Sequence, residues 1–277
     1  MGNFFNIMIS QPLNTVIINW AKRVQRNGGA TPSLQTLTAM DRFYNGLCAN
    51  NLSASIITLN VFAPDSLIAC QTPLFTSFGG KDPWLNTNFT AAHLSVDGLQ
   101  GATGRFFNSG VSCSLAWVGA QSSSMGMTLY VTSASNGNEN DMGTWNATAP
   151  YFSLYAGYSG TAYFDCNTSV AGGRCYASNN SWTGYIAGNR ISRTDSRIDK
   201  ASSTVRYQTI ATATTLATGA NTAPAVPIGV FRMMGSTTLC TKRLSFAAAH
   251  RGFDSGSAVT FYNLIQQLRK GLGGGWV

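Results

Sequence analysis

Carboxylate side chains are scarce in this sequence, which limits the acid and base chemistry that it can perform. The chain has a single glutamate, Glu139, which forms an acidic i,i+2 pair with Asp141 inside the turn-like segment SNGNENDMG. Glycoside hydrolysis usually needs two carboxyl groups that face each other across the scissile bond. No third carboxylate follows this pair closely. The sequence therefore predicts no catalytic residue and disfavours a glucanase-like hydrolase, which stays the second alternative.

Patterns for nucleophilic catalysis and metal binding are equally sparse. The chain has two histidines, His93 and His250, and its six cysteines form no CxxC motif, so a zinc site is not expected. The segment GYSG at 157–160 lacks the Gly-x-Ser-x-Gly spacing of a nucleophile elbow. We expect no cofactor, with calcium as the alternative at aspartates near expected strand ends. These aspartates are Asp97, Asp141 and Asp165.

Two cysteines are spaced so that they could form a disulfide bond. Cys166 and Cys175 bracket the segment NTSVAGGR, whose adjacent glycines could turn a hairpin and bring the thiols within disulfide range. We hypothesise a disulfide between them. Cys48 and Cys70 fall in apolar contexts instead, where buried free thiols that act as small hydrophobic groups are expected.

Aromatic residues are concentrated between residues 145 and 185. Aromatic side chains on the loops of a sandwich can stack on sugar rings, because they combine apolar faces with a polar rim. About half of these aromatic residues are expected to be core residues on alternating strands, among them Phe152, Tyr155 and Phe164. The candidate ligand-binding residues are Trp145, Tyr158 and Trp182.

The charged residues are few and mostly basic. The formal net charge is +8 and the sequence pI is about 9.4, which favours an acidic partner. Arginines in the segment 190–206 alternate with strand-like sequence instead of lining one helix face, which argues against nucleic acid as the partner. We predict a basic contact surface formed by Arg190, Arg193, Arg197 and Arg206.

The overall composition suits a protein that is covered by neighbours or works outside a cell. Only 10% of the residues are charged, and hydroxyl and amide side chains fill the polar positions. The alternative explanation is that an all-β chain needs Thr, Ser and Gly for its strands and turns. The N-terminal residues lack the basic region of a secretory signal, and no apolar stretch is long enough to cross a membrane.

Hydrophobic periodicity predicts helices at both ends of the chain. Apolar residues at helical spacing indicate one helix that ends near 27–29 and another that begins near 31. A buried strand at 56–62 and a brief helix at 65–71 follow. At the other end, Asp254 is an expected N-cap. The apolar stripe behind it consists of Val259, Tyr262, Ile265 and Leu268.

Short alternating segments separated by turns fill the sequence from about 76 to 250. About ten such strands are typical of a two-sheet sandwich. We therefore predict a mainly β protein with three parts: a helical N-terminal segment at 1–75, a β-sandwich at 76–250, and a C-terminal helix and tail at 251–277 packed on the sandwich.

Several motifs resemble a group of phage and environmental proteins with a concanavalin A-like (laminin-G-like) jelly roll. The matching segments are the strand and capped helix of SFAAAHRGFDSGSAVTFYNLIQQLRKGLGGGWV (245–277), the segment DRFYNGLCANNLSASIITLNVFAPDSLIACQTPL (41–74) and GLQGATGRFFNSGVS (98–112). The resemblance covers most of 15–112 and 200–277 and is thin between 113 and 190. The ending GGGW at 273–276 departs from the pattern.

This resemblance implies a non-enzymatic structural protein of a phage virion. Its expected roles are tail, fibre or capsid decoration, or attachment to a host-surface glycan. It would be made in the host cytoplasm and would bind other virion proteins. It would form a homo-oligomer and would not insert into a membrane. The alternative is a carbohydrate-binding module that functions alone.

Overall fold

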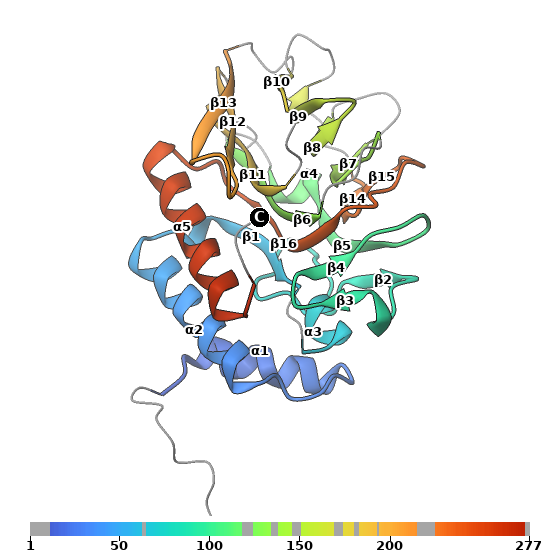
Figure 1. The fold of residues 1–277 in the computed structure, drawn as a ribbon, viewed down its shortest axis with the longest axis vertical. Helices are drawn as coiled ribbons and strands as arrows, with labels where there is room; N and C mark the ends of the chain where they lie inside the picture. The colour runs from blue at the N-terminus through green and yellow to red at the C-terminus, as the bar shows by residue number, and fades with distance from the viewer. Residues whose placement is uncertain are drawn as a thin grey trace, which may run out of the picture.

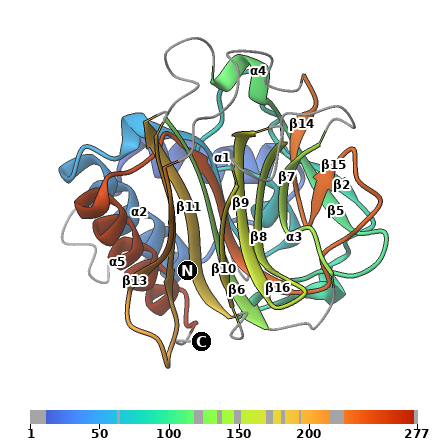
Figure 2. The ribbon, with the colours of Figure 1, turned by 90° about the horizontal axis from the view of Figure 1, so that it is seen from above.

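The computed structural model of the chain describes residues 12–62, 65–117, 124–133, 138–145, 151–168, 174–179, 183–192, 194–214 and 225–274. Their strands form two largely antiparallel sheets, and α1, α2 and α5 lie on one side (Figures 1 and 2). The helices are α1 (Thr15–Arg26), α2 (Leu34–Ala49), α3 (Leu67–Gln71), α4 (Cys113–Ala116) and α5 (Ser255–Gly271).

Sheet A has eight strands and contributes one face of the sandwich. Its order is β13 (Gln208–Ala213), β12 (Asp195–Ala201), β11 (Gly184–Ser192), β6 (Met125–Ser133), β16 (Arg243–His250), β4 (Gly98–Gln100) and β3 (Leu94–Ser95). The eighth strand, β1 (Ile56–Val61), pairs with β16. β1 is buried along its whole length, which confirms the predicted buried strand.

Sheet B also has eight strands. Its order is β10 (Cys175–Ser178), β9 (Thr161–Thr168), β8 (Tyr151–Tyr158), β7 (Met142–Thr144), β14 (Pro227–Val230), β5 (Phe106–Ser112) and β2 (Leu85–Thr87). A short strand, β15 (Arg232–Met234), pairs in parallel with β7. The predicted mainly β, two-sheet architecture with terminal helices is confirmed.

The two sheets enclose one apolar core. Side chains from sheet A, such as Leu129 and Ile186, meet side chains from sheet B, such as Phe152 and Phe164. The sheets approach closely where the ring of Phe164 lies over Gly188, since a Cβ atom there would stand 2.1 Å from that ring. The prediction that Phe152 and Phe164 belong to the core is confirmed.

A second apolar cluster joins α1, α2 and α5 to the other face of sheet A. Trp20, Phe43 and Phe261 from these helices are fully or almost fully buried there, together with Tyr130 and Phe246 from the sheet. Figure 2 shows α2 and α5 on one side of the strands and β8 and β9 farther from them. The molecule thus has three layers: helices, sheet A and sheet B.

The C-terminal helix begins where the sequence indicates, but its buried face differs from the predicted stripe. The Asp254 carboxylate accepts a hydrogen bond from the Ser257 backbone amide, which confirms the N-cap. Val259 is exposed, whereas Ile265 and Leu268 are buried. A three-residue step turns a helix by about 300° instead of a full circle, so such a stripe rotates away from one face. The buried side is completed by Phe261.

The predicted disulfide is absent, because Cys166 and Cys175 are both free thiols. Cys175 lies opposite Phe164 in the register of β9 and β10, so the two cysteines are offset along the hairpin. Cys166 contacts the sulfur of Met125 at 3.3 Å instead. Cys70 is buried as expected, but Cys48 is exposed near the end of α2.

Among the described residues, every helix is too short or too polar to cross a bilayer.

A tyrosine-lined cleft as the candidate functional site

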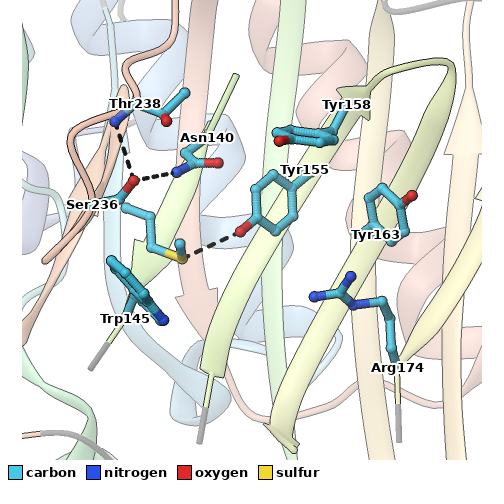
Figure 3. A pocket seen from close by; sticks show the side chains of 9 residues that line it. Asn140, Trp145, Tyr155, Tyr158, Tyr163, Arg174, Ser236 and Thr238 are labelled. Atoms are coloured by element: carbon cyan, nitrogen blue, oxygen red, sulfur yellow. Dashed lines mark hydrogen bonds between the residues drawn. The ribbon is translucent and has the colours of Figure 1, made fainter. Parts of the chain in front are cut away.

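The outer face of sheet B carries an open cleft of about 360 Å³ (Figure 3). The residues around it come from β8 and β9, from the ends of β7 and β10, and from β15 and the turn after it. They are Asn140, Trp145, Tyr155, Tyr158, Tyr163, Arg174, Met233, Ser236 and Thr238.

The pleat of β8 and β9 turns the tyrosines towards this cleft. Successive side chains of a strand point to opposite faces, and the neighbours of Tyr155 and Tyr163, such as Leu154 and Phe164, point into the core. Tyr155 and Tyr163 lie directly opposite each other in the ladder, with ring centroids 6.0 Å apart and nearly perpendicular planes. Tyr158 contacts both rings, at 5.9 and 6.3 Å. The three rings therefore form one aromatic cluster.

Arg174 is the charged residue of the lining, and a buried carboxylate holds it in place. Its Nε and Nη2 atoms donate to the two Asp165 oxygens at 2.6 and 2.9 Å. The Ser153 hydroxyl donates to the same carboxylate at 3.1 Å. The guanidinium also lies over the Tyr163 ring, 4.8 Å from its centroid. Figure 3 shows its free end turned towards the middle of the cleft, where it can donate hydrogen bonds.

Polar groups line the opposite wall. The side-chain amide of Asn140 donates to the Ser236 hydroxyl at 2.7 Å, which also accepts from the backbone amide of Thr238 at 3.1 Å. The carbonyl oxygen of Asn140 is turned towards Tyr155 (Figure 3). Burial raises the pKa of Tyr155 to about 12, so its hydroxyl is neutral at physiological pH. This hydroxyl donates to the sulfur of Met233 at 3.4 Å.

A buried charge cluster anchors the segment before β7, which contains Asn140. The Lys242 ammonium lies 2.7 Å from the Asp141 carboxylate and 3.3 Å from that of Glu139. Burial lowers the pKa of Lys242, but the interactions with Asp141, Cys240 and Glu139 together outweigh this effect and raise the pKa above its usual value. Asp141 also accepts from the backbone amide of Ala156 at 2.7 Å, which ties β7 to β8.

The same cluster contains the one group of potential metal ligands found among the described residues. The ligand atoms of Glu139, Asp141 and Cys240 lie within 4.8 Å of one another. Lys242 already supplies the positive charge that a bound cation would supply. Of the aspartates that were the calcium alternative, Asp141 is paired with Lys242 and Asp165 with Arg174. The geometry fits a structural ion cluster better than a metal site.

Two of the three predicted ligand-binding residues lie together at the cleft. Trp145 and Tyr158 both line the cleft, whereas Trp182 lies outside the described residues. Tyr155 was expected in the core but faces the cleft, since strand alternation alone does not tell which face of a sheet is buried. Arg174 and Tyr163 were not predicted. The signal that could have identified Tyr163 is its alternation with core residues in the segment TAYFDC.

The predicted basic contact surface is wrong for two of its four arginines. Arg190 and Arg197 are buried. Arg190 donates to backbone carbonyl groups, including that of Cys166 on the other sheet. Arg197 pairs with Asp199 at 2.9 Å and donates to the carbonyl oxygen of Phe253 at 2.6 Å. Their guanidinium groups thus stabilise the fold. Of the other two, Arg206 is exposed and Arg193 lies outside the described residues.

Comparisons with known proteins identify no family for this chain. No protein-family description matches it, and no curated protein does. A sialidase from Trypanosoma rangeli, in complex with 2,3-difluorosialic acid, has 9% identity and a TM-score of 0.45. The matched part covers 83% of this chain and 40% of the sialidase, so this chain spans less than half of that protein's length.

Two further solved structures show similarities of the same order. Domain 4 of AbnA, a GH43 extracellular arabinanase from Geobacillus stearothermophilus, in complex with arabinotriose, has 11% identity and a TM-score of 0.41. The match covers 76% of this chain and 98% of that domain. A protein of unknown function from Shewanella oneidensis has 11% identity and a TM-score of 0.35, with 76% and 93% covered. At these scores the likeness carries no argument for a particular substrate or reaction.

These comparisons nevertheless contradict the prediction of a non-enzymatic phage virion protein. The similar structures with a stated activity are a sialidase, an arabinanase domain and a GH54 arabinofuranosidase, all carbohydrate-active proteins. None of these structures is a phage protein. The virion assignment, its tail, fibre and decoration roles, and the exclusion of enzymatic activity are therefore withdrawn as wrong.

Proposed function

We propose that this chain binds carbohydrate in the cleft on the outer face of sheet B. The observation that carries the proposal is the combination of Trp145, Tyr158 and a fixed guanidinium, that of Arg174, around one open cleft. Sugar rings have apolar C–H faces that stack on aromatic rings and hydroxyl groups that accept hydrogen bonds. The carbohydrate-active proteins among the similar structures agree with this ligand class.

The charges around the cleft favour a neutral sugar. Arg174 is the charged residue among those lining the cleft, and its charge is balanced by the buried carboxylate of Asp165. The pair therefore offers N–H donors without a net local charge. Asn140 adds a carbonyl acceptor on the opposite wall. A neutral hydroxylated ligand matches these groups better than an acidic one, which would need an uncompensated cation.

The experiment is a glycan array with the purified chain, followed by calorimetry with the best neutral oligosaccharide. Trp145→Ala and Tyr158→Ala are expected to weaken binding about tenfold each, since each removes a stacking contact of about 1 kcal/mol together with buried apolar area. The matched control is Tyr44→Ala, because Tyr44 is an aromatic residue on α2, away from the cleft. Binding should not change between low and high salt.

Two results would overturn the proposal. The first is an array on which no carbohydrate binds. The second is binding that survives both cleft substitutions. An assay for newly formed reducing ends on the bound oligosaccharide, run in parallel, tests whether the same cleft cleaves its ligand.

The proposal also includes the resemblance to concanavalin A-like jelly rolls and the predicted division of the chain into three segments. The ends of the chain resemble concanavalin A-like jelly rolls, whose sandwich architecture agrees with the observed sheets. We retain the division into segments 1–75, 76–250 and 251–277. On this division, the terminal helices cover sheet A and leave the face of sheet B open to ligand. Self-association is retained as a prediction, for which light scattering is the measurement.

A further inference from the structure

The aromatic surface continues beyond the cleft along a row of tyrosines. Tyr155 lies opposite Tyr163 in the ladder of β8 and β9, and Tyr163 lies opposite Tyr176 in the ladder of β9 and β10. Directly opposed residues of neighbouring strands project from the same face of a sheet. The ring centroids are 6.0 Å apart in the first pair and 6.2 Å apart in the second. The three rings therefore cross the strands as one continuous row.

Exposure increases along this row. Tyr155 and Tyr163 are partly buried in the cleft, whereas Tyr176 is 63% exposed and lies outside the cleft lining. It has the highest exposed fraction of the large apolar side chains among the described residues. Its neighbour Cys175 points into the core, so β10 packs against the apolar core with its other face. The exposed ring on this strand can stack on a ligand that leaves the cleft in this direction.

Arg174 lies between the two ends of the row. It immediately precedes β10 in the chain, and its guanidinium covers the ring of Tyr163, which contacts Tyr176. A chain of sugars that followed the row would pass this guanidinium after the cleft and before Tyr176. The row thus alternates apolar faces with a hydrogen-bond donor, which is the pattern that successive sugar units present.

We propose that the site binds an extended neutral oligosaccharide that crosses β8, β9 and β10, with Tyr176 as a separate outer subsite. This inference rests on the proposed carbohydrate binding and adds the length and direction of the ligand. A single sugar fills the cleft and does not reach Tyr176. A longer oligosaccharide contacts both.

The test measures affinity against chain length. Cello-, xylo-, arabino- and malto-oligosaccharides, each from the monosaccharide upward, are titrated into the full chain and into Tyr176→Ala. The longer members of the series that binds are expected to bind Tyr176→Ala about threefold to tenfold more weakly than the native chain, because one stacking contact is lost. The monosaccharide is expected to bind both proteins equally. Tyr176→Phe keeps the ring and should retain the native profile.

The outcomes separate this inference from the proposed function. If Tyr176→Ala binds every length like the native chain while Tyr158→Ala loses binding, the outer subsite is wrong and the cleft stands. If Tyr176→Ala weakens the monosaccharide as much as the longer sugars, the separate subsite is also wrong. If no series binds the native chain, the proposed carbohydrate binding itself fails. The melting temperature of Tyr176→Ala should equal the native value, which excludes misfolding as the cause.

Discussion

The two outer faces of the sandwich use the same residue type for opposite purposes. On sheet A, the ring of Tyr185 is fully buried beneath α5, where it contacts the rings of Tyr207 and Tyr262 at 6.1 and 5.2 Å. On sheet B, the rings of Tyr163 and Tyr176 contact each other at 6.2 Å and face solvent. Clustered tyrosines stabilise the fold on the covered face and are available to a ligand on the open face. Helix coverage, not sequence composition, separates the two roles.

Removing one tyrosine from each face is the sharpest test of this comparison. Tyr185→Ala is expected to lower the free energy of unfolding by about 3–5 kcal/mol, because the cavity forms between sheet A and the helices. Tyr176→Ala is expected to change it by less than about 0.5 kcal/mol, because its ring is mostly in water. Urea denaturation of both variants measures the difference. Equal losses would show that the two faces do not differ in this way.

The open face is also supported by a buried charge cluster, and Lys242 tests its contribution. Lys242→Met is expected to lower the free energy of unfolding by about 3 kcal/mol, because the carboxylates of Asp141 and Glu139 lose the cation that compensates them in a buried site. Lys81→Met is the matched control, since Lys81 is exposed. Chemical denaturation provides the measurement. A variant as stable as the native chain would mean that the cluster is not needed.

The covered face should respond to pH through His250. This imidazole stacks on Phe253 with ring centroids 4.2 Å apart, and burial lowers its pKa from 6.5 to about 4. The unfolded chain therefore takes up a proton at higher pH than the folded chain, so stability decreases as the pH falls from about 6.5 towards 4. The expected contribution is a loss of about 2 kcal/mol between about pH 7.5 and pH 5.

His250→Gln separates this contribution from that of other groups. Glutamine does not titrate, and its side chain is able to retain a hydrogen bond to Thr128, which lies 2.9 Å from the imidazole Nε2. The variant should lose less stability than the native chain over the same pH range, measured by urea denaturation at each pH. Parallel pH profiles for the two proteins would contradict the assignment to His250.

The smallest expected effect concerns the cysteines beneath the open face. Because Cys166 and Cys175 are free, dithiothreitol is expected to leave the melting temperature unchanged. A disulfide that closes so short a loop would contribute about 2–3 kcal/mol. A marked decrease of the melting temperature on reduction would therefore restore the disulfide hypothesis and change the account of β9 and β10.

The fold was largely predictable because its signals are local. The N-cap at Asp254, the buried strand at 56–62 and the apolar positions of the first helix each depend on a few adjacent residues. Alternation also identified the strands of the sandwich. It did not identify which face of each strand is covered, and for this reason Tyr155 was assigned to the core although it faces the cleft.

The candidate site was less predictable because its polar contacts join distant parts of the chain. Polar contacts of the same long range account for the wrong prediction at Arg197, which was expected in a basic contact surface but is buried. Its partner Phe253 comes from the turn before α5 and covers it. The pairing of Lys242 with Asp141 likewise connects two strands that are far apart in sequence. Spacing along the chain carries no information about such pairs.

The pairing of β16 has a consequence for synthesis in the cell. This strand pairs with β6, β1 and β4 in sheet A, and all three precede it in the chain. Until the ribosome has released β16, the strands already made present unpaired backbone edges, and edges of that kind recruit other chains. The apolar segment FAAA at 246–249 must therefore reach its place before a neighbouring nascent chain does, so slow translation or truncation ahead of Arg243 would favour aggregation over folding.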